Sequence, residues 1–172
     1  MTMTRSAQPL SAGLFFGALA LYIATATSGA FWLDSSELAA AGVTLGIPHA
    51  PGHPLYVILA HAISLLPLGS IGFRIALLSA LFGALSVLLL FKLTLKLQSV
   101  ASKETPTAAV AALAAATFAV SDALWFQSVR AEVYTLNLVL ALGLLHVAID
   151  WARSEDTRLQ PLTVGAFVLG LG

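Results

Sequence analysis

The sequence predicts an all-α protein whose helices cross a membrane several times. Of its 172 residues, 59% are hydrophobic and only 9% are charged, and the mean hydropathy is +0.93. Average soluble domains carry about 25% charged residues. The few charges separate long uncharged runs, and an apolar run of about 20 residues is what a helix needs to cross a bilayer. The chain is therefore expected to be a polytopic membrane protein.

Composition also excludes several classes of function. The formal net charge is zero, with 8 basic and 8 acidic residues, so no basic patch is available for nucleic acid. The chain has no cysteine. Disulfides, thiolate catalysis and cysteine-based metal sites are therefore excluded.

Residues 10–32 predict the first span. A signal peptide is the alternative, with Arg5 as its basic region, residues 10–23 as its apolar core and residues 24–26 as its cleavage site. The span is favoured because the apolar run is longer than a signal peptide needs. The run also leads directly into Trp32, a residue type that collects at membrane interfaces.

Residues 34–68 predict a juxtamembrane segment. Its apolar part, residues 55–66, is bounded by prolines and is only 12 residues long. A run of about 10–14 residues is typical of a re-entrant or interfacial helix. Cytoplasmic loops are enriched in lysine and arginine. If the segment does not cross, the lysines that follow the next span lie with Arg5 on the cytoplasmic side, as this rule requires: Lys92, Lys96 and Lys103.

Further spans are predicted at 72–91, 106–124 and 133–151, and an incomplete one at 162–172. Because the last run stops within apolar sequence, we expect residues 1–172 to be one transmembrane domain, the N-terminal part of a longer protein. The predicted topology places on the outer side most of the polar residues that could take part in catalysis or binding: Asp34, Glu37, His49, His53, Arg74, Arg130 and Glu132.

Asp34 and Glu37 begin the juxtamembrane segment. Their spacing predicts a capping box, in which Asp34 caps a short helix and Glu37 reaches back to it. A carboxylate at the positive end of a helix dipole stays ionised. Held at a water-facing membrane boundary, Asp34 can also act as a general base. The structural and the catalytic interpretations are compatible, because a cap would fix the position of the base.

His49 and His53 flank a turn that holds three prolines in seven residues, Pro48 to Pro54. Prolines exclude a regular helix here. The loop is either a rigid linker or a preorganised loop whose imidazoles face the site. Histidines beside carboxylates suit divalent cations. A metal site is not favoured, however, because Pro51 keeps the two histidines off a common helix face.

Arg74 and Arg130 each precede a predicted span, and Glu132 follows Arg130 closely. They can be interface anchors or an exposed charge pair. The alternative is recognition of phosphate, to which the planar guanidinium is well matched. Ionisable residues at membrane depth are costly and are usually functional.

These motifs together resemble the multi-span glycosyltransferases of the GT-C fold. The nearest group is a bacterial family related to the plexin-type protein O-mannosyltransferase. The motifs lie in order between Phe31 and Trp151, and the matching residues are Asp34, Ser35 and Glu37; His49, Pro51, Gly52, Pro54, Leu55 and Tyr56; Phe73, Arg74, Leu78, Ser79 and Ala80; and Ala131 to Tyr134.

The resemblance implies a GT-C-like bundle with juxtamembrane helices after the first span, and a catalytic acid in the first outer loop. It implies an inverting transfer of sugar from a polyprenyl-phosphate donor to an acceptor hydroxyl on a protein or glycan. The expected location is a bacterial inner membrane, or the endoplasmic reticulum in a eukaryote. The lipid bilayer and the lipid-linked sugar are then partners, and nucleic acid is not.

Roles follow for individual residues under this resemblance. Asp34 is the general base, and Glu37 orients it or the acceptor. The leaving phosphate is bound by Arg74, Arg130 and His53. Supporting positions are His49, Tyr56, Glu132 and Tyr134. No cofactor is required, and a divalent metal is not favoured. The chain shows no glycine-rich phosphate loop, which agrees with a donor that carries no nucleotide.

Two other functions remain open. A transporter subunit would use the carboxylates and histidines as an ion relay. Against this, the charges gather at one face rather than at the midplane, and no inverted repeat is visible. A non-catalytic scaffold, or a fragment without activity, is the second alternative.

Overall fold

The structure is a computed structural model that describes residues 7–29, 34–101, 106–153 and 160–170. Within these ranges every regular element is a helix, which confirms the predicted all-α fold class. Three helices have the length and apolar composition needed to cross a membrane, α1 (Ala7–Thr25), α4 (Ile71–Ala101) and α7 (Tyr134–Arg153). A bent pair, α5 (Ala108–Ala119) and α6 (Asp122–Ser128), would make a fourth span if it crosses as a unit.

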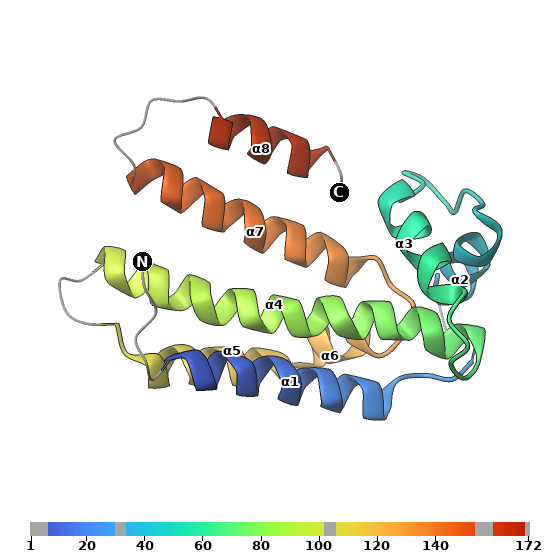
Figure 1. Ribbon diagram of the computed structural model, residues 1–172, viewed down its shortest axis with the longest axis horizontal. Helices are drawn as coiled ribbons and strands as arrows, with labels where there is room; N and C mark the ends of the chain where they lie inside the picture. Colours follow the sequence, from blue (N-terminus) through green and yellow to red (C-terminus); the bar gives the residue numbers. More distant parts are fainter. Residues whose placement is uncertain (1–6, 30–33, 102–105, 154–159, 171–172) are drawn as a thin grey trace.

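Helix α4 is the centre of the bundle, and α1, α5, α6 and α7 lie along it (Figure 1). Its 31 residues correspond to about 46 Å at 1.5 Å per residue, well beyond the roughly 30 Å hydrocarbon core. The helix therefore extends beyond the predicted span 72–91, and the bounds of the span stay a prediction. Past Lys92 the helix is joined to α7, where the Lys96 ammonium donates to Asp150 (2.8 Å) and to the His146 carbonyl (3.2 Å).

Close packing of α1 and α6 on α4 depends on Gly83. A Cβ at this position would overlap the Ser128 side chain of α6 and would lie 3.1 Å from Cε2 of Tyr22 on α1. Tyr22 is fully buried, and its hydroxyl donates to the Ala119 carbonyl at 2.7 Å. Three helices therefore meet at one glycine, and a hydrogen bond across the bundle extends this contact to α5.

The predicted span 106–124 is broken in the structure. Helix α5 ends at Ala119, and α6 begins at Asp122 after a bend of 61°. Ser121 explains the break, because its hydroxyl donates to the Phe118 carbonyl (2.7 Å) and accepts from the amide of Leu124 (3.4 Å). A serine that bonds its own backbone in this way ends one helix and caps the next.

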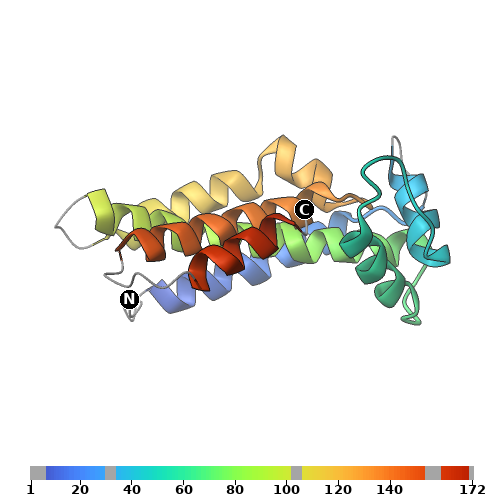
Figure 2. The ribbon, with the colours of Figure 1, turned by 90° about the horizontal axis from the view of Figure 1, so that it is seen from above.

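Helices α2 (Ser35–Thr44) and α3 (Pro54–Ser64) form a separate lobe on the first turns of α4 (Figures 1 and 2). They are 10 and 11 residues long, so each is too short to cross a bilayer, and α3 is apolar. Gly42 lets them touch, because its Cβ would lie 2.7 Å from Cβ of Ala60. The Nδ1 atom of His61 on α3 lies 3.0 Å from the Gly42 carbonyl oxygen, so this histidine joins the two helices.

The last described helix, α8 (Gln160–Leu169), packs on α7. Figure 1 shows it running beside α7 on the side away from α1. Several positions used in the sequence predictions lie outside the described residues: Arg5, Phe31, Trp32, Lys103 and the end of the last predicted span at 171–172. The assignment of residues 1–172 to one domain stays a prediction.

We predict that Gly83→Ala loosens the bundle. The added methyl overlaps Ser128, and overpacking of this kind typically costs about 1–3 kcal/mol. Gly13→Ala on α1 is the matched control, because no heavy atom lies within 4 Å of a Cβ there. Thermal unfolding in detergent measures both. An equal midpoint for the two variants would contradict the packing described.

Candidate functional site

The acidic residues lie at the start of α2. Asp34 adopts helical backbone angles (φ −79°, ψ −6°) and its side chain caps no amide of the helix. The predicted capping box is therefore absent. Glu37 does not reach back to the helix start because the following loop offers better donors. Its carboxylate accepts the His49 amide at 2.7 Å and lies 3.0 Å from His49 Nδ1.

His49 lies between the two acids. Its Nε2 is 4.0 Å from Oδ2 of Asp34, while its Nδ1 is the atom beside Glu37. The hydrogen bond to Glu37 raises the pKa of His49, and the same bond lowers the pKa of Glu37. Each of the three side chains is about half exposed, so the cluster is open to water. We call Asp34, Glu37 and His49 the acidic cluster.

The proline-rich loop holds His49 against α2 and places His53 beside it. Its turn is closed by the Gly52 amide, which donates to the His49 carbonyl at 2.9 Å. Gly52 has φ +96°, where glycine is favoured, and His53 has φ +41°. The two imidazole rings lie 5.7 Å apart, edge to face. Burial, and then the charge of His49, lower the pKa of His53.

Beneath the acidic cluster lies a buried ion pair. Arg130 Nη2 is 3.1 Å from Glu132 Oε1, and both side chains are 2% exposed. The guanidinium lies over the Phe126 ring, 4.0 Å from its centre, and donates to Gln127 Oε1 at 3.0 Å. Burial raises the pKa of Glu132, and Arg130 opposes this rise. The interpretation of Arg130 and Glu132 as an exposed charge pair is therefore wrong, because the loop between α6 and α7 turns both side chains inward.

Two buried serines tie Glu132 to the helices on either side. Ser35 of α2 donates to Glu132 Oε1 at 3.3 Å. Ser79 of α4 donates to the Glu132 carbonyl (3.1 Å) and accepts its amide (3.0 Å). Both serines belong to the sequence motifs, but no role was predicted for them. Their signal was weak because a serine inside an apolar helix usually bonds its own backbone.

Tyr56 lies in the same buried region, at 1% exposure. Its hydroxyl makes no hydrogen bond among the described residues, and burial raises its pKa. Its supporting role stays a prediction. Tyr134 is different, because it is 55% exposed and lines a cavity beside α6 and α7.

Arg74 is engaged elsewhere. Its guanidinium donates to three backbone carbonyls of the α3–α4 turn, those of Leu68 (2.8 Å), Ser64 (2.7 Å) and Gly69 (3.0 Å). These bonds close the turn and position the α2–α3 lobe on α4. Its predicted contact with phosphate stays a prediction.

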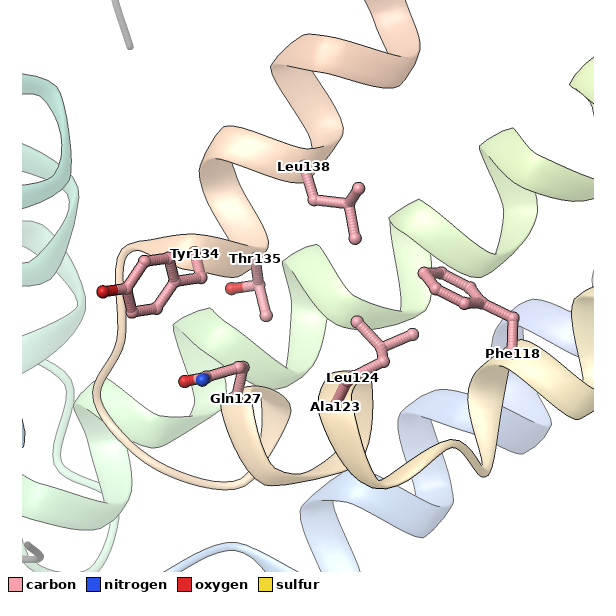
Figure 3. Close-up of a pocket in the computed structure, with 7 residues that line it drawn as sticks. All are labelled: Phe118, Ala123, Leu124, Gln127, Tyr134, Thr135 and Leu138. Atoms are coloured by element: carbon pink, nitrogen blue, oxygen red, sulfur yellow. The ribbon is translucent and has the colours of Figure 1, made fainter.

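Two cavities adjoin this end of the bundle. One, of about 190 Å³, lies beside the acidic cluster and is lined mostly by small residues: Gly29, Ser35, Ser36, Ala39, Ile71, Gly72 and Ala131. The other, of about 250 Å³, lies between the α5–α6 bend and α7 (Figure 3). Its walls are almost wholly apolar, and Gln127, Thr135 and Tyr134 lie together at one end of it. We call it the bend groove.

The described residues predicted to share one side of the membrane do gather at one end of the bundle. The acidic cluster, Arg74 and the Arg130–Glu132 pair surround the first turns of α4, where the α2–α3 lobe lies (Figure 1). Lys96 lies near the other end of α4. This separation gives the bundle one end with half-exposed acids and a buried polar layer beneath them.

Comparison with known proteins assigns the chain to a family. The family model for the N-terminal domain of protein O-mannosyl-transferase TMEM260 matches residues 34–172. Protein O-mannosyl-transferase TMEM260 of Mus musculus is 35% identical over 175 residues, which cover 96% of this chain and 24% of the mouse protein. The chain thus spans about a quarter of the length of the curated relative it matches. No solved structure matches the chain.

We predict that Arg130→Met destabilises the protein strongly, because it leaves the Glu132 carboxylate buried without its charged partner. Breaking a buried ion pair from one side costs about 3–5 kcal/mol. The double variant Arg130→Met with Glu132→Gln removes both charges and should recover much of that loss. Denaturant or thermal unfolding of both proteins measures the difference. A double variant no more stable than Arg130→Met would show that the pairing is not what stabilises this layer.

Proposed function

The chain belongs to the family of protein O-mannosyl-transferase TMEM260 N-terminal domains, and we propose that it is the membrane-embedded part of a glycosyltransferase. In this proposal a sugar passes from a polyprenyl-phosphate donor to an acceptor hydroxyl at the acidic end of the bundle. The observation that carries the proposal is the half-exposed acidic cluster on top of a buried Arg130–Glu132 pair, at the water-facing end of membrane helices.

Asp34 is the proposed general base. Attack of a hydroxyl on the anomeric carbon requires removal of its proton, and a positioned carboxylate contributes about 10²–10⁴-fold to such a step. The Asp34 side chain is 49% exposed, so an acceptor can reach it. Glu37 supports it indirectly, because its bonds to His49 hold the proline-rich loop beside Asp34. A single displacement of this kind inverts the anomeric centre.

The leaving phosphate requires positive charge or hydrogen-bond donors. Of the three residues predicted for this role, His53 lies at the surface beside His49, and Arg130 lies beneath the cluster. Arg74 is held by the α3–α4 turn. We therefore assign the phosphate to the region between His53 and Arg130, and Arg74 to positioning the lobe.

The bend groove supports a lipid-linked donor. Its apolar walls come from α5, α6 and α7, which belong to the membrane bundle, and residues on both sides of the helix break line it (Figure 3). Gln127 lies at the polar end of the groove and accepts a hydrogen bond from Arg130. An isoprenoid chain in this groove would bring its phosphate toward Arg130.

The name of the mouse relative supports mannose as the sugar and a protein hydroxyl as the acceptor. Serine and threonine are the residues that offer such hydroxyls on proteins. Because that relative is from a mouse, the endoplasmic reticulum membrane is the location we favour over the bacterial inner membrane. GT-C architecture and the lumenal face of the membrane are parts of the same proposal.

The test is sugar transfer from a labelled polyprenyl-phosphate mannose in membranes of cells that produce the protein. Asp34→Asn keeps the size of the side chain and removes the base, so transfer should fall about 10²-fold or more. Asp122→Asn is the matched control, because Asp122 is an exposed acid in the first turn of α6, outside the cluster. Equal transfer by wild type and Asp34→Asn, at equal expression, would overturn the assignment of the base.

A further inference from the structure

We propose that Asp34, Glu37 and His49 bind one divalent transition-metal cation, and that Mn²⁺ fits this set of ligands. The sequence alone did not favour a metal site, because the two histidines expected to bind the metal, His49 and His53, do not share a helix face. The structure instead brings His49 together with two carboxylates. One ligand atom from each of the three side chains lies within 4.8 Å of the other two. This inference does not depend on the proposed sugar transfer.

The spacing is close to that of a coordination sphere. Bonds from a divalent metal to imidazole nitrogen or carboxylate oxygen are about 2.0–2.2 Å, so two ligands on opposite sides of one ion lie up to about 4.4 Å apart. One imidazole binds an ion through only one of its nitrogens. His49 Nδ1 lies 3.0 Å from Glu37 Oε2, and one nitrogen of His49 with one oxygen of each acid all lie within 4.8 Å of one another. Small rotations of three half-exposed side chains would bring their atoms onto one ion.

The backbone of the loop already fixes one ligand. The His49 amide donates to Glu37 Oε1, which leaves Glu37 Oε2 directed at the imidazole. A metal ion bound to His49 Nδ1 and Glu37 Oε2 would take the place of the hydrogen bond between them. The hydrogen bond from the His49 amide to Glu37 Oε1 would remain and would hold the carboxylate in place, as hydrogen bonds to metal-binding carboxylates commonly do.

A second observation, below the cluster, also points to a cation. Glu132 is 1% exposed, and its Oε2 makes no hydrogen bond among the described residues. Its charge acts on both Asp34 and His49, and its other oxygen accepts from Ser35, the residue after Asp34. A buried acceptor that lacks a donor is costly. A cation above it, or a water bound to that cation, would satisfy this oxygen.

The charges of the site are also unbalanced. Three carboxylates, those of Asp34, Glu37 and Glu132, face one guanidinium and two imidazoles, and burial lowers the pKa of the second imidazole, His53. Arg130 is already paired with Glu132, and His49 supplies at most one further positive charge. The guanidinium of Arg74 is bound by the carbonyls of the α3–α4 turn. A divalent cation would therefore neutralise an excess of negative charge.

The ligand set indicates the kind of cation. Carboxylates suit Mg²⁺, Ca²⁺ and Mn²⁺, and imidazole suits the transition metals, so a mixed set of two carboxylates and one imidazole fits Mn²⁺. Three protein ligands leave further positions open. Water or an oxygen atom of a bound phosphate can occupy them.

The experiment uses the protein purified in detergent without a polyhistidine tag and stripped of metal with a chelator. It is titrated with Mn²⁺, and the electron paramagnetic resonance signal of free Mn²⁺ reports binding. We expect one equivalent to bind. Glu37→Gln and His49→Gln should each raise Kd at least tenfold, and Glu132→Gln, which lies behind the ligands, about tenfold by the usual effect of outer-shell partners. Asp122→Asn should bind as wild type does.

Circular dichroism checks that each variant keeps its helices, and Glu37 is exposed, so its substitution should not disturb the fold. Absence of Mn²⁺ binding up to millimolar concentration would overturn the proposal. So would unchanged binding in both Glu37→Gln and His49→Gln. Because the readout needs no sugar, the proposed transferase function can fail or stand independently of this result.

Discussion

The contacts of the buried residue Glu132 hold together the end of the bundle that carries the acidic cluster. Its side chain meets Ser35 at the start of α2, and its backbone exchanges two hydrogen bonds with Ser79 of α4. Arg130, two residues before it, neutralises it. One residue therefore joins the lobe that carries the acids, the central helix and the loop between α6 and α7. A buried charge is costly unless it is paired and hydrogen-bonded, so these partners have to come together.

The length of α4 makes this arrangement compatible with a membrane. The helix is long enough to fill the hydrocarbon core and still extend beyond it, and the α2–α3 lobe packs on its first turns (Figure 1). Arg74 closes the turn between the lobe and α4, and Gly83 lets α1 and α6 approach the same helix lower down. The acids are thus held near water while their support is anchored in the apolar bundle.

Sequence reasoning could predict the features that depend on local composition. Apolar runs gave the helices, and the short run between Pro54 and Pro67 indicated a segment that does not cross. The break at Ser121 was missed because a serine is tolerated within an apolar helix, and only its bonds to Phe118 and Leu124 show that it ends one. Hydropathy could not reveal this.

Contacts between residues far apart in the chain were the other features that sequence reasoning could not predict. Ser79 and Glu132 are 53 positions apart, and Ser35 and Glu132 are 97 apart. No spacing rule connects them, so the roles of both serines were invisible even though the motifs contained them. Arg74 and Glu37 were limited differently. Their partners include backbone groups 5 to 12 positions away, which the turn and the proline-rich loop bring near and which side-chain patterns do not predict.

Hydrogen–deuterium exchange of Ser79→Ala in detergent is the most direct test of the claim that Glu132 joins α2 to α4. Ser86→Ala is the matched control, because Ser86 is equally buried on α4 but, among the described residues, donates to the Phe82 carbonyl of its own helix and to no other element. The account predicts faster exchange in residues 129–133 and at the start of α2 for Ser79→Ala alone. Equal exchange in these segments for the two variants and the wild type would contradict it.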